Sequence, residues 1–302
     1  MKIKKNKMTK QFGQKLVRVS TSDGLYLHGY YVPSKESKVA VLHIHGFEGN
    51  FYENLFVHVL ANTLEGSDIA FLSVNTRGNG KDTDFNTTDG NVKRVGAHYE
   101  LLEEAYIDID AWMEFLIKEG YETIILQGHS LGTVKVVRYL TEGKYKDRVN
   151  KLILLSPFDK KAFIEPYTKK TVEELLAKAQ QKIDEGKEEE RVTRDFDIAD
   201  VSYKSYVSWY KQDDFGRMFE FCTKDYDFPA LKKISIPTKI IVGSKDEYFH
   251  VSNPEHPEEA MKLLLDNIPN SKGKIIDGAV HSFKPHEEIM AKEVINFVLN
   301  TN

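Results

Sequence analysis

The feature of this sequence that most restricts its fold is a series of short, nearly continuous apolar runs separated by longer amphipathic stretches. Strands that are covered on both faces require runs of this kind. The stretches between the runs have helical spacing, and strands that alternate with helices are typical of βαβ units. We therefore predict an α/β fold with a mostly parallel central sheet and helices on both faces. The predicted strands are Val39–Ile44, Ile69–Val74, Thr123–Leu126, Val149–Leu155, Thr238–Val242 and Lys274–Ile276. The predicted helices span roughly 52–64, 98–119, 131–142, 256–267 and 287–299.

Two segments depart from this alternation. Residues 15–20 and 25–32 are rich in β-formers and flank Ser-Asp-Gly, which predicts an antiparallel opening hairpin. Residues 156–229 contain a charged, helix-forming stretch followed by a stretch crowded with aromatic side chains. We interpret this second segment as an inserted helical cap over the C-terminal edge of the sheet. The predicted domains are thus a core of residues 1–155 and 230–302 and a cap of residues 156–229.

Composition limits the classes of partner and compartment. The chain has 302 residues, with 42 basic and 46 acidic side chains and a net charge of -4. This balance gives no electrostatic reason to expect nucleic acid or an anionic membrane as a partner, and a small-molecule ligand fits better. Cys222 is the single cysteine, so no internal disulfide is expected, and no Cys/His spacing suggests zinc. The basic N-terminus lacks the apolar stretch of a signal peptide. We expect a cytoplasmic monomer or homodimer without metal or cofactor.

The stretch QGHSLG, residues 127–132, lies where a predicted strand passes into a predicted helix. Glycines two positions before and two positions after Ser130 allow a tight elbow without side-chain collisions. The hydroxyl of Ser130 would then project from the top of the sheet, at the N-terminus of the next helix. This context favours Ser130 as a nucleophile over a purely structural turn.

A serine nucleophile needs a base, and the base needs an orienting acid. Asp246 and His281 follow the last two predicted strands, so they complete the order Ser, Asp, His that this architecture uses. Glu247 is an adjacent rival for the acid, whereas Asp277 comes too early, at the end of the strand before His281. We predict His281 as base and Asp246 as acid.

Two backbone N–H groups are predicted to stabilise the oxyanion of the tetrahedral intermediate. One belongs to Leu131, directly after the nucleophile, and the other to Phe47, where Gly46 lets the loop after the first parallel strand curl inward. The remaining histidines have no comparable partner order. His129 must diverge from Ser130 on a tight elbow, so it is predicted to pack or to line a pocket wall. His45 is assigned to structure or to the rim.

Two further patterns are interpreted as structural. Asn75–Gly80 follows a strand end but lacks the features of a P-loop or a dinucleotide turn. Arg77 is instead predicted to tie this loop to neighbouring carboxylates or carbonyls. The acidic pairs Glu103/Glu104 and Asp108/Asp110 are predicted to lie on a solvated helix face or to cap the helix.

Taken together, the motifs resemble those of the α/β-hydrolase superfamily. They are HGF at 45–47, NTRGNG at 75–80, GHSLG at 128–132, GSKDE at 243–247 and AVHSF at 279–283. The resemblance covers nearly the whole chain outside the cap and implies the same roles for Ser130, Asp246, His281, Phe47 and Leu131. The HGF loop and the cap are similar to those of bacterial cinnamoyl/feruloyl-type esterases. Segments at 177–191, 203–206, 213–215 and 244–248 are similar to a fungal-centred group that includes siderophore esterases.

The expected function is therefore hydrolysis of carboxylic esters through an acyl-enzyme. Aromatic side chains of the cap could line an apolar pocket above Ser130, which favours a medium, bulky or aromatic acyl group. The same groups could cleave thioesters, amides, peptides or siderophore esters, and these alternatives stay open. A non-catalytic binding protein is a further alternative. A haloalkane dehalogenase is excluded because it uses an aspartate where this chain has Ser130.

Overall fold

The fold is built on a central sheet whose strands coincide with the predicted apolar runs. A computed structural model describes residues 15–194, 196, 200–251, 253 and 255–300. The main sheet consists of β1 (Lys15–Ser20), β2 (Tyr26–Val32), β3 (Val39–Ile44), β4 (Ala70–Val74), β7 (Thr123–His129), β8 (Val149–Leu155), β9 (Thr238–Gly243) and β10 (Ser271–Ile276). A separate hairpin contains β5 (Thr83–Asn86) and β6 (Val92–Val95).

The order of the strands places the functional loops side by side. The sheet runs β1-β2-β4-β3-β7-β8-β9-β10. The first two strands are antiparallel to their neighbours, as the predicted hairpin required, and the strands from β4 to β10 are parallel. In a parallel sheet all carboxyl ends lie at one edge. The loops after β3, β7, β9 and β10 therefore open at the same edge.

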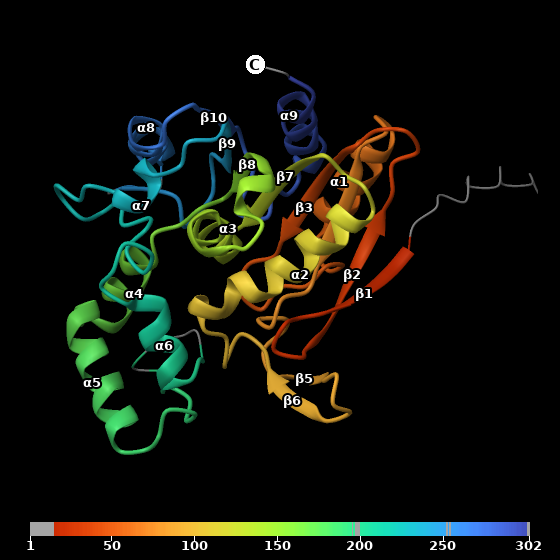
Figure 1. Ribbon diagram of the computed structural model, residues 1–302. Coiled ribbons are helices and arrows are strands. Elements are labelled where there is room, and N and C mark those ends of the chain that lie inside the picture. The colour runs from red at the N-terminus through yellow and green to blue at the C-terminus, as the bar shows by residue number, and fades with distance from the viewer. Residues whose placement is uncertain (1–14, 195, 197–199, 252, 254, 301–302) are drawn as a thin grey trace, which may run out of the picture.

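Helices cover both faces of the sheet, as expected (Figure 1). The α-helices are α1 (Leu55–Glu65), α2 (Ala105–Lys118), α3 (Leu131–Glu142), α4 (Lys160–Thr168), α5 (Val172–Asp184), α6 (Tyr203–Tyr210), α7 (Pro229–Lys232), α8 (Pro257–Asn267) and α9 (Glu287–Leu299). Single 3-10 turns occur at Leu102–Glu104 and Lys146–Arg148.

Alternate residues of each strand enter two separate cores. Val41 packs in the core under α1 and α9, whereas its neighbour Leu42 packs in the core on the α2, α3 and α8 side. Both side chains are fully buried. This burial on both faces is the physical reason why the strands appear as continuous apolar runs in the sequence.

The segment between β8 and β9 is helical and includes α4, α5 and α6, which lie together at one side of the molecule (Figure 1). Helix α5 begins with a capping box, in which Thr171 and Glu174 satisfy each other's backbone N–H groups. It ends at Asp184, because Gly186 follows with φ of +75°. The division into core 1–155 plus 230–302 and cap 156–229 stays a prediction.

The hairpin β5–β6 was not predicted. Its strands are four residues each, and most of their side chains are exposed. Phe85 and Val95 are buried, so the apolar signal is too weak to stand out in the sequence. The turn signal Asp89-Gly90 was the available clue, since Gly90 has φ of +84°.

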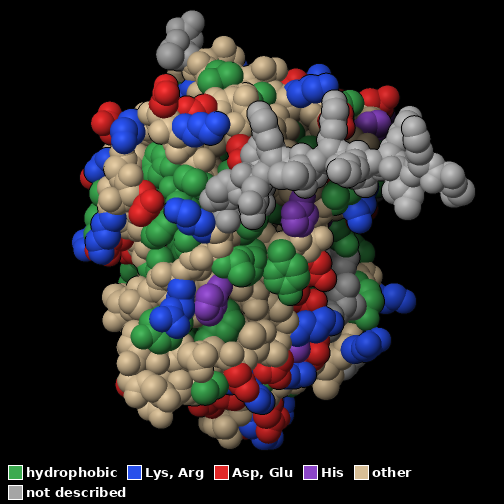
Figure 2. Space-filling view, turned by 90° about the vertical axis from the view of Figure 1, so that its right-hand side faces the viewer, with side chains coloured by type: hydrophobic (Ala, Val, Ile, Leu, Met, Phe, Trp, Pro, Cys, Tyr) green, Lys and Arg blue, Asp and Glu red, His purple; other side chains and the backbone are tan. Residues whose placement is uncertain are grey.

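The surface carries both signs of charge. On the face in Figure 2, Lys and Arg side chains are interspersed with Asp and Glu side chains. This mixing agrees with the near-balance of acidic and basic residues in the sequence. Across the residues that the structure describes, none of the helices combines the length and the apolar character needed to cross a bilayer.

Candidate active site

Ser130 occupies a strained elbow between β7 and α3. Its backbone has φ of 54° and ψ of -125°, a conformation that costs a non-glycine residue about 1 to 3 kcal/mol. The elbow is anchored to the neighbouring strand β8, because the Ser130 N–H donates to the carbonyl of Leu155 at 2.9 Å. The serine side chain stays partly accessible while the residues around it are buried. Strain that is retained at an accessible side chain points to a functional position.

The two glycines beside the serine are required by close packing. A Cβ atom on Gly128 would lie 2.3 Å from the carbonyl oxygen of Gly132. A Cβ atom on Gly132 would lie 2.4 Å from the carbonyl oxygen of Ile44 on β3. A side chain at Gly132 would therefore push the start of α3 away from β3, and one at Gly128 would push it away from β7.

Asp246 and His281 meet at the carboxyl ends of β9 and β10. The Nδ1 atom of His281 lies 2.9 Å and 3.0 Å from the two carboxylate oxygens of Asp246. The Asp246 side chain is fully buried, and that of His281 is 17% exposed. Since a carboxylate can only accept, Nδ1 carries a proton, and in the neutral form of the ring Nε2 is left as an acceptor. This is the protonation state that a general base for a serine requires.

The other two acids considered in the sequence lie elsewhere. Glu247 is exposed to solvent. Asp277 accepts a hydrogen bond from the Ser244 hydroxyl at 3.1 Å. Of the three acids, Asp246 is therefore the one with a hydrogen bond to the His281 ring.

The backbone of His281 is fixed by two side chains. His129 Nε2 lies 3.0 Å from the His281 carbonyl oxygen, and the Ser156 hydroxyl donates to the same oxygen at 3.1 Å. The His129 ring packs against Phe56 and Phe283. Burial lowers the pKa of His129 to about 3, so the ring is neutral and donates through Nε2. His129 is thus a packed, structural histidine, as the sequence predicted.

The loop after β3 brings Gly46 against the elbow. A Cβ atom on Gly46 would lie 2.8 Å from Ser130 Cβ and 3.3 Å from the backbone nitrogen of Leu131. The Leu131 N–H is in the first turn of α3, where no intrahelical acceptor is available. Among the hydrogen bonds of the described residues, none uses the N–H of Phe47. The Leu131 N–H thus lies next to Ser130, and the loop that carries Phe47 packs against the same elbow. The roles of Phe47 and Leu131 as oxyanion donors stay predictions.

The chain matches one protein family over most of its length. The family model described as "Serine aminopeptidase, S33" matches residues 35–288. The chain belongs to the S33 serine aminopeptidase family. The predicted resemblance to the α/β-hydrolase superfamily is thereby confirmed, and with it the fold class. A search of curated proteins returned no match.

Solved structures share the fold of this S33 family member at low sequence identity. A structure of Est1E from Butyrivibrio proteoclasticus with ferulic acid bound has 21% identity and a TM-score of 0.64, covering 94% of this chain and 98% of that one. A monoglyceride lipase from Saccharomyces cerevisiae, in complex with a substrate analog, has 14% identity and a TM-score of 0.67, covering 96% and 97%. The carboxylesterase CesB from Bacillus subtilis has 17% identity and a TM-score of 0.55, covering 96% and 93%.

A buried polar network lies near the Ser130 elbow, and the sequence did not predict it. Lys135 and Glu100 form an ion pair of 2.6 Å, and both side chains are fully inaccessible. Thr76 and His45 extend the network toward the elbow. The sequence had assigned His45 to structure or to the rim, without this connection. One signal was available, since Lys135 interrupts a run of three valines in a helix that the sequence predicted.

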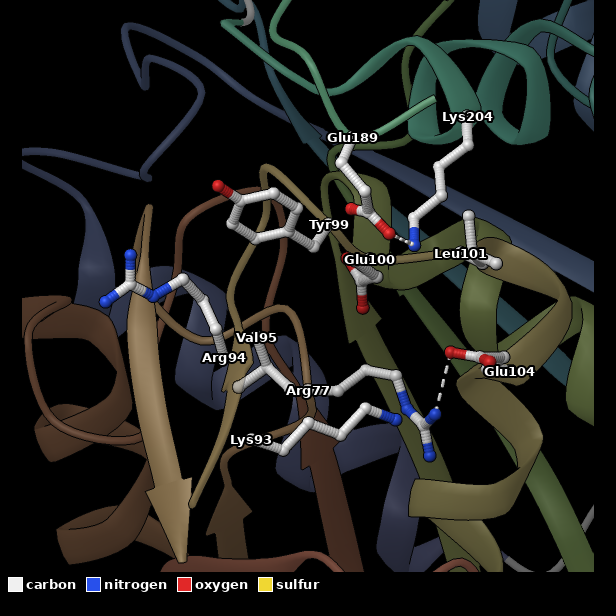
Figure 3. A pocket seen from close by; sticks show the side chains of 10 residues that line it. All are labelled: Arg77, Lys93, Arg94, Val95, Tyr99, Glu100, Leu101, Glu104, Glu189 and Lys204. Carbon is white, nitrogen blue, oxygen red and sulfur yellow. Dashed lines mark hydrogen bonds and ion pairs between the residues drawn. The ribbon is translucent and has the colours of Figure 1, made fainter. Parts of the chain in front are cut away.

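Arg77 ties its loop to carboxylates, as predicted. It binds Asp108 at 2.9 Å, Glu104 at 2.7 Å and Asp23 at 3.2 Å. The prediction that Asp108 lies on a solvated face was wrong, because Arg77 draws this carboxylate into the interior, where it is 0% exposed. Figure 3 shows Arg77 and Glu100 in the wall of a cavity of about 340 Å³. Neither Ser130 nor His281 lines this cavity.

Aromatic side chains surround the Ser130 edge of the sheet. The Phe47 ring packs edge-on against Trp209 of α6, with centroids 4.9 Å apart. Tyr248 packs edge-on against His281 at 4.8 Å, and Phe158 contacts both of these rings. Most other aromatics of α6 pack within their own segment, for example Tyr206 stacked on Tyr210. Trp209 is thus the residue that joins α6 to the predicted oxyanion loop.

Two buried histidines predict acid sensitivity of the fold. Burial lowers the pKa of His43 and of His129 from 6.5 to about 3. The unfolded chain therefore takes up protons near pH 6.5 that the folded chain refuses until about pH 3, so stability is present above pH 6.5 and is lost as pH falls. Each histidine should cost about 1.4 kcal/mol of unfolding free energy per pH unit in this window.

Urea unfolding at a series of pH values checks this expectation. The buried Asp159, whose pKa is raised to about 6, acts in the opposite sense below pH 6, so the comparison should be between variants. His129→Gln should reduce the pH dependence of the unfolding free energy by the contribution of one histidine. An unchanged slope would mean that the ring is already protonated in the native protein.

Proposed function

We propose that the protein hydrolyses carboxylic esters through an acyl-enzyme on Ser130. The observation that carries the proposal is the contact of the buried Asp246 carboxylate with His281 Nδ1, at the same sheet edge as the strained Ser130 elbow. Membership of a serine hydrolase family supports it. Ser130 is the proposed nucleophile, His281 the general base, and Asp246 the acid that orients the imidazole.

The proposed reaction has two halves. Nε2 of His281 takes the proton of the Ser130 hydroxyl while Oγ attacks the ester carbonyl carbon. The negative oxygen of the tetrahedral intermediate accepts hydrogen bonds from the N–H groups of Phe47 and Leu131. Collapse expels the alcohol, which takes the proton from His281. Water then attacks the acyl-enzyme, again with His281 as base, and releases the acid and free Ser130.

A medium, bulky or aromatic acyl group is the proposed substrate class. Phe47, Trp209, Phe158 and Tyr248 offer ring faces and edges beside the reacting groups. Such a wall favours apolar or aromatic acyl groups over acetate. The structure of Est1E with bound ferulic acid, which shares this fold, supports the same choice.

Trp209→Ala tests the aromatic wall. We expect kcat/KM for a feruloyl or octanoyl p-nitrophenyl ester to fall about tenfold, because one face of the acyl site is lost, and that for the acetate to stay within about twofold. Steady-state assays with graded p-nitrophenyl esters measure this ratio. The matched control is Tyr167→Ala, since Tyr167 is 49% exposed. An equal loss for all chain lengths would show that Trp209 does not select the acyl group.

A peptidase is the second candidate function, because the family description names serine aminopeptidases. The discriminating experiment compares p-nitrophenyl esters with p-nitroanilides of unblocked amino acids. The ester proposal predicts turnover of the esters at rates well above those of the anilides. Preferential cleavage of the anilides would replace esterase by aminopeptidase, with the same roles for Ser130 and His281. Thioesters and siderophore esters belong in the same screen.

A further inference from the structure

The predicted oxyanion loop is held from behind by a histidine in a single protonation state. His45 Nε2 lies 3.1 Å from the backbone N–H of Thr76, and its Nδ1 lies 2.8 Å from the carbonyl oxygen of Gly46. A backbone N–H can only donate, so Nε2 accepts, and the ring proton sits on Nδ1. Nδ1–H therefore donates to the Gly46 carbonyl. Burial, with Lys135 as the next cause, keeps the pKa of His45 well below its usual value.

This hydrogen bond, together with a longer one of 3.3 Å from the Gly49 N–H to the same oxygen, holds the direction of one peptide group. The peptide between Gly46 and Phe47 is trans, because the cis bond found in the described chain is Lys284-Pro285. In a trans peptide the carbonyl and the N–H point to opposite sides. With the Gly46 oxygen held by His45, the Phe47 N–H must point away from His45. Gly46 itself packs against Ser130, so the direction of this N–H decides whether it can serve the oxyanion.

The histidine is in turn held by a buried ion pair. Lys135 Nζ donates to the Thr76 hydroxyl at 3.3 Å, and the same hydroxyl lies 3.1 Å from His45 Nε2 and 3.5 Å from Glu100. Lys135 and Glu100 are both fully buried. An ion pair without solvent contact adds little net stability compared with apolar residues of similar volume. Its position directly behind Thr76 suggests a role in holding the loop.

We infer that Lys135 and Glu100, acting through Thr76 and His45, are positioning residues that aim the Phe47 N–H at the reaction centre. The ion pair anchors Thr76, Thr76 orients His45, and His45 orients the peptide that donates to the oxyanion. All four side chains are buried, so the proposed role is to position the loop and not to bind substrate. The inference rests on the proposed function, since it assigns the support of the same oxyanion site.

The first test separates His45 as a donor from His45 as a filler of space. His45→Asn places a side-chain N–H near the original Nδ1, whereas His45→Leu removes the donor at similar volume. We expect His45→Leu to lower kcat for p-nitrophenyl esters by about 10²- to 10³-fold with little change in KM, the effect of losing one oxyanion donor. His45→Asn should recover activity to within about tenfold of wild type. Equal activity of the two variants would contradict the inference.

The second test addresses the ion pair. Lys135→Met with Glu100→Gln removes both charges at nearly constant volume, and Thr76→Val breaks the link to His45 while it keeps the backbone N–H. Each should lower kcat about tenfold at unchanged KM. If the double variant does not fold, Thr76→Val carries this test alone. The matched control is Lys118→Met with Glu114→Gln, an exposed pair of 2.7 Å on α2, which should keep wild-type kcat.

These experiments can fail in two ways, one for the proposed function and one for the positioning role. If wild-type protein turns over neither esters nor anilides, the proposed function fails. If wild type is active and the Thr76 and ion-pair variants keep kcat within twofold, the proposed function stands and the positioning role is lost. A fall in thermal stability without a fall in kcat would likewise assign the pair to folding alone.

Discussion

Ser130→Ala is expected to lower kcat for p-nitrophenyl esters by about 10⁶-fold, the loss seen when a serine nucleophile is removed. The variant keeps the elbow, because alanine adds no atoms to a site where Ser130 already has φ of 54°. The proposed oxyanion donors and the proposed acyl site also remain, so the substrate should still bind. The loss should therefore appear in kcat, with KM nearly unchanged. Stopped and continuous assays at saturating ester measure it.

The control for this prediction is Ser67→Ala, an exposed turn serine between α1 and β4. It should match wild type in kcat, KM and thermal unfolding. A Ser130→Ala protein that retained more than about one hundredth of wild-type kcat would contradict the acyl-enzyme mechanism. Water activated directly by His281 would then be the simpler explanation.

Asp246→Asn is expected to lower kcat by about 10⁴-fold. The asparagine amide can donate to Nδ1 of His281, where the carboxylate can only accept. The ring would then carry its proton on Nε2, and in the proposed mechanism it could not take a proton from Ser130. The geometry of the site would be preserved, so the defect lies in the protonation state of one ring. Single-turnover acylation rates measure it directly.

Glu247→Gln is the matched control, because it makes the same chemical change one residue further along the chain. Glu247 is exposed, and the residue with both carboxylate oxygens at Nδ1 is Asp246. The control should keep activity within about twofold of wild type. The opposite pattern, with Glu247→Gln inactive and Asp246→Asn active, would reverse the assignment of the acid.

Much of the fold could be predicted because it depends on local patterns. A strand buried on both faces has to be apolar at every position, and Val149–Leu155 was predicted with its observed bounds for that reason. Helix α3 was also predicted with its observed bounds, and it begins directly after the elbow serine. The hairpin β5–β6 was missed since its short strands are mostly exposed and bear little apolar signal.

The candidate site was partly predictable for a topological reason. Ser130, Asp246 and His281 each follow a strand, and parallel strands bring their carboxyl ends to one edge. Their catalytic roles stay predictions. The supporting residues were not predictable in this way, because Lys135 and Glu100 come from α3 and a distant loop. Their pairing depends on the packed interior, which no local pattern records.

The role of the aromatic side chains also depended on tertiary structure. The sequence placed many of them in one stretch but could not separate those that form a local core from those that face the site. Tyr206 is fully buried beside Tyr210, whereas Trp209 reaches Phe47. The proposed acyl selectivity depends on a few contacts of this second kind, so composition alone predicted only a broad class of acyl group.

The most direct measurement of the central claim is covalent labelling with a fluorophosphonate followed by intact-mass and peptide mass spectrometry. An activated serine attacks the phosphorus, expels fluoride and retains the phosphonyl group. The account predicts one adduct per wild-type chain, located on the peptide that contains Ser130, and no adduct on Ser130→Ala. Absence of labelling on the folded wild type, or equal labelling of both proteins, would contradict the assignment of Ser130 as the nucleophile.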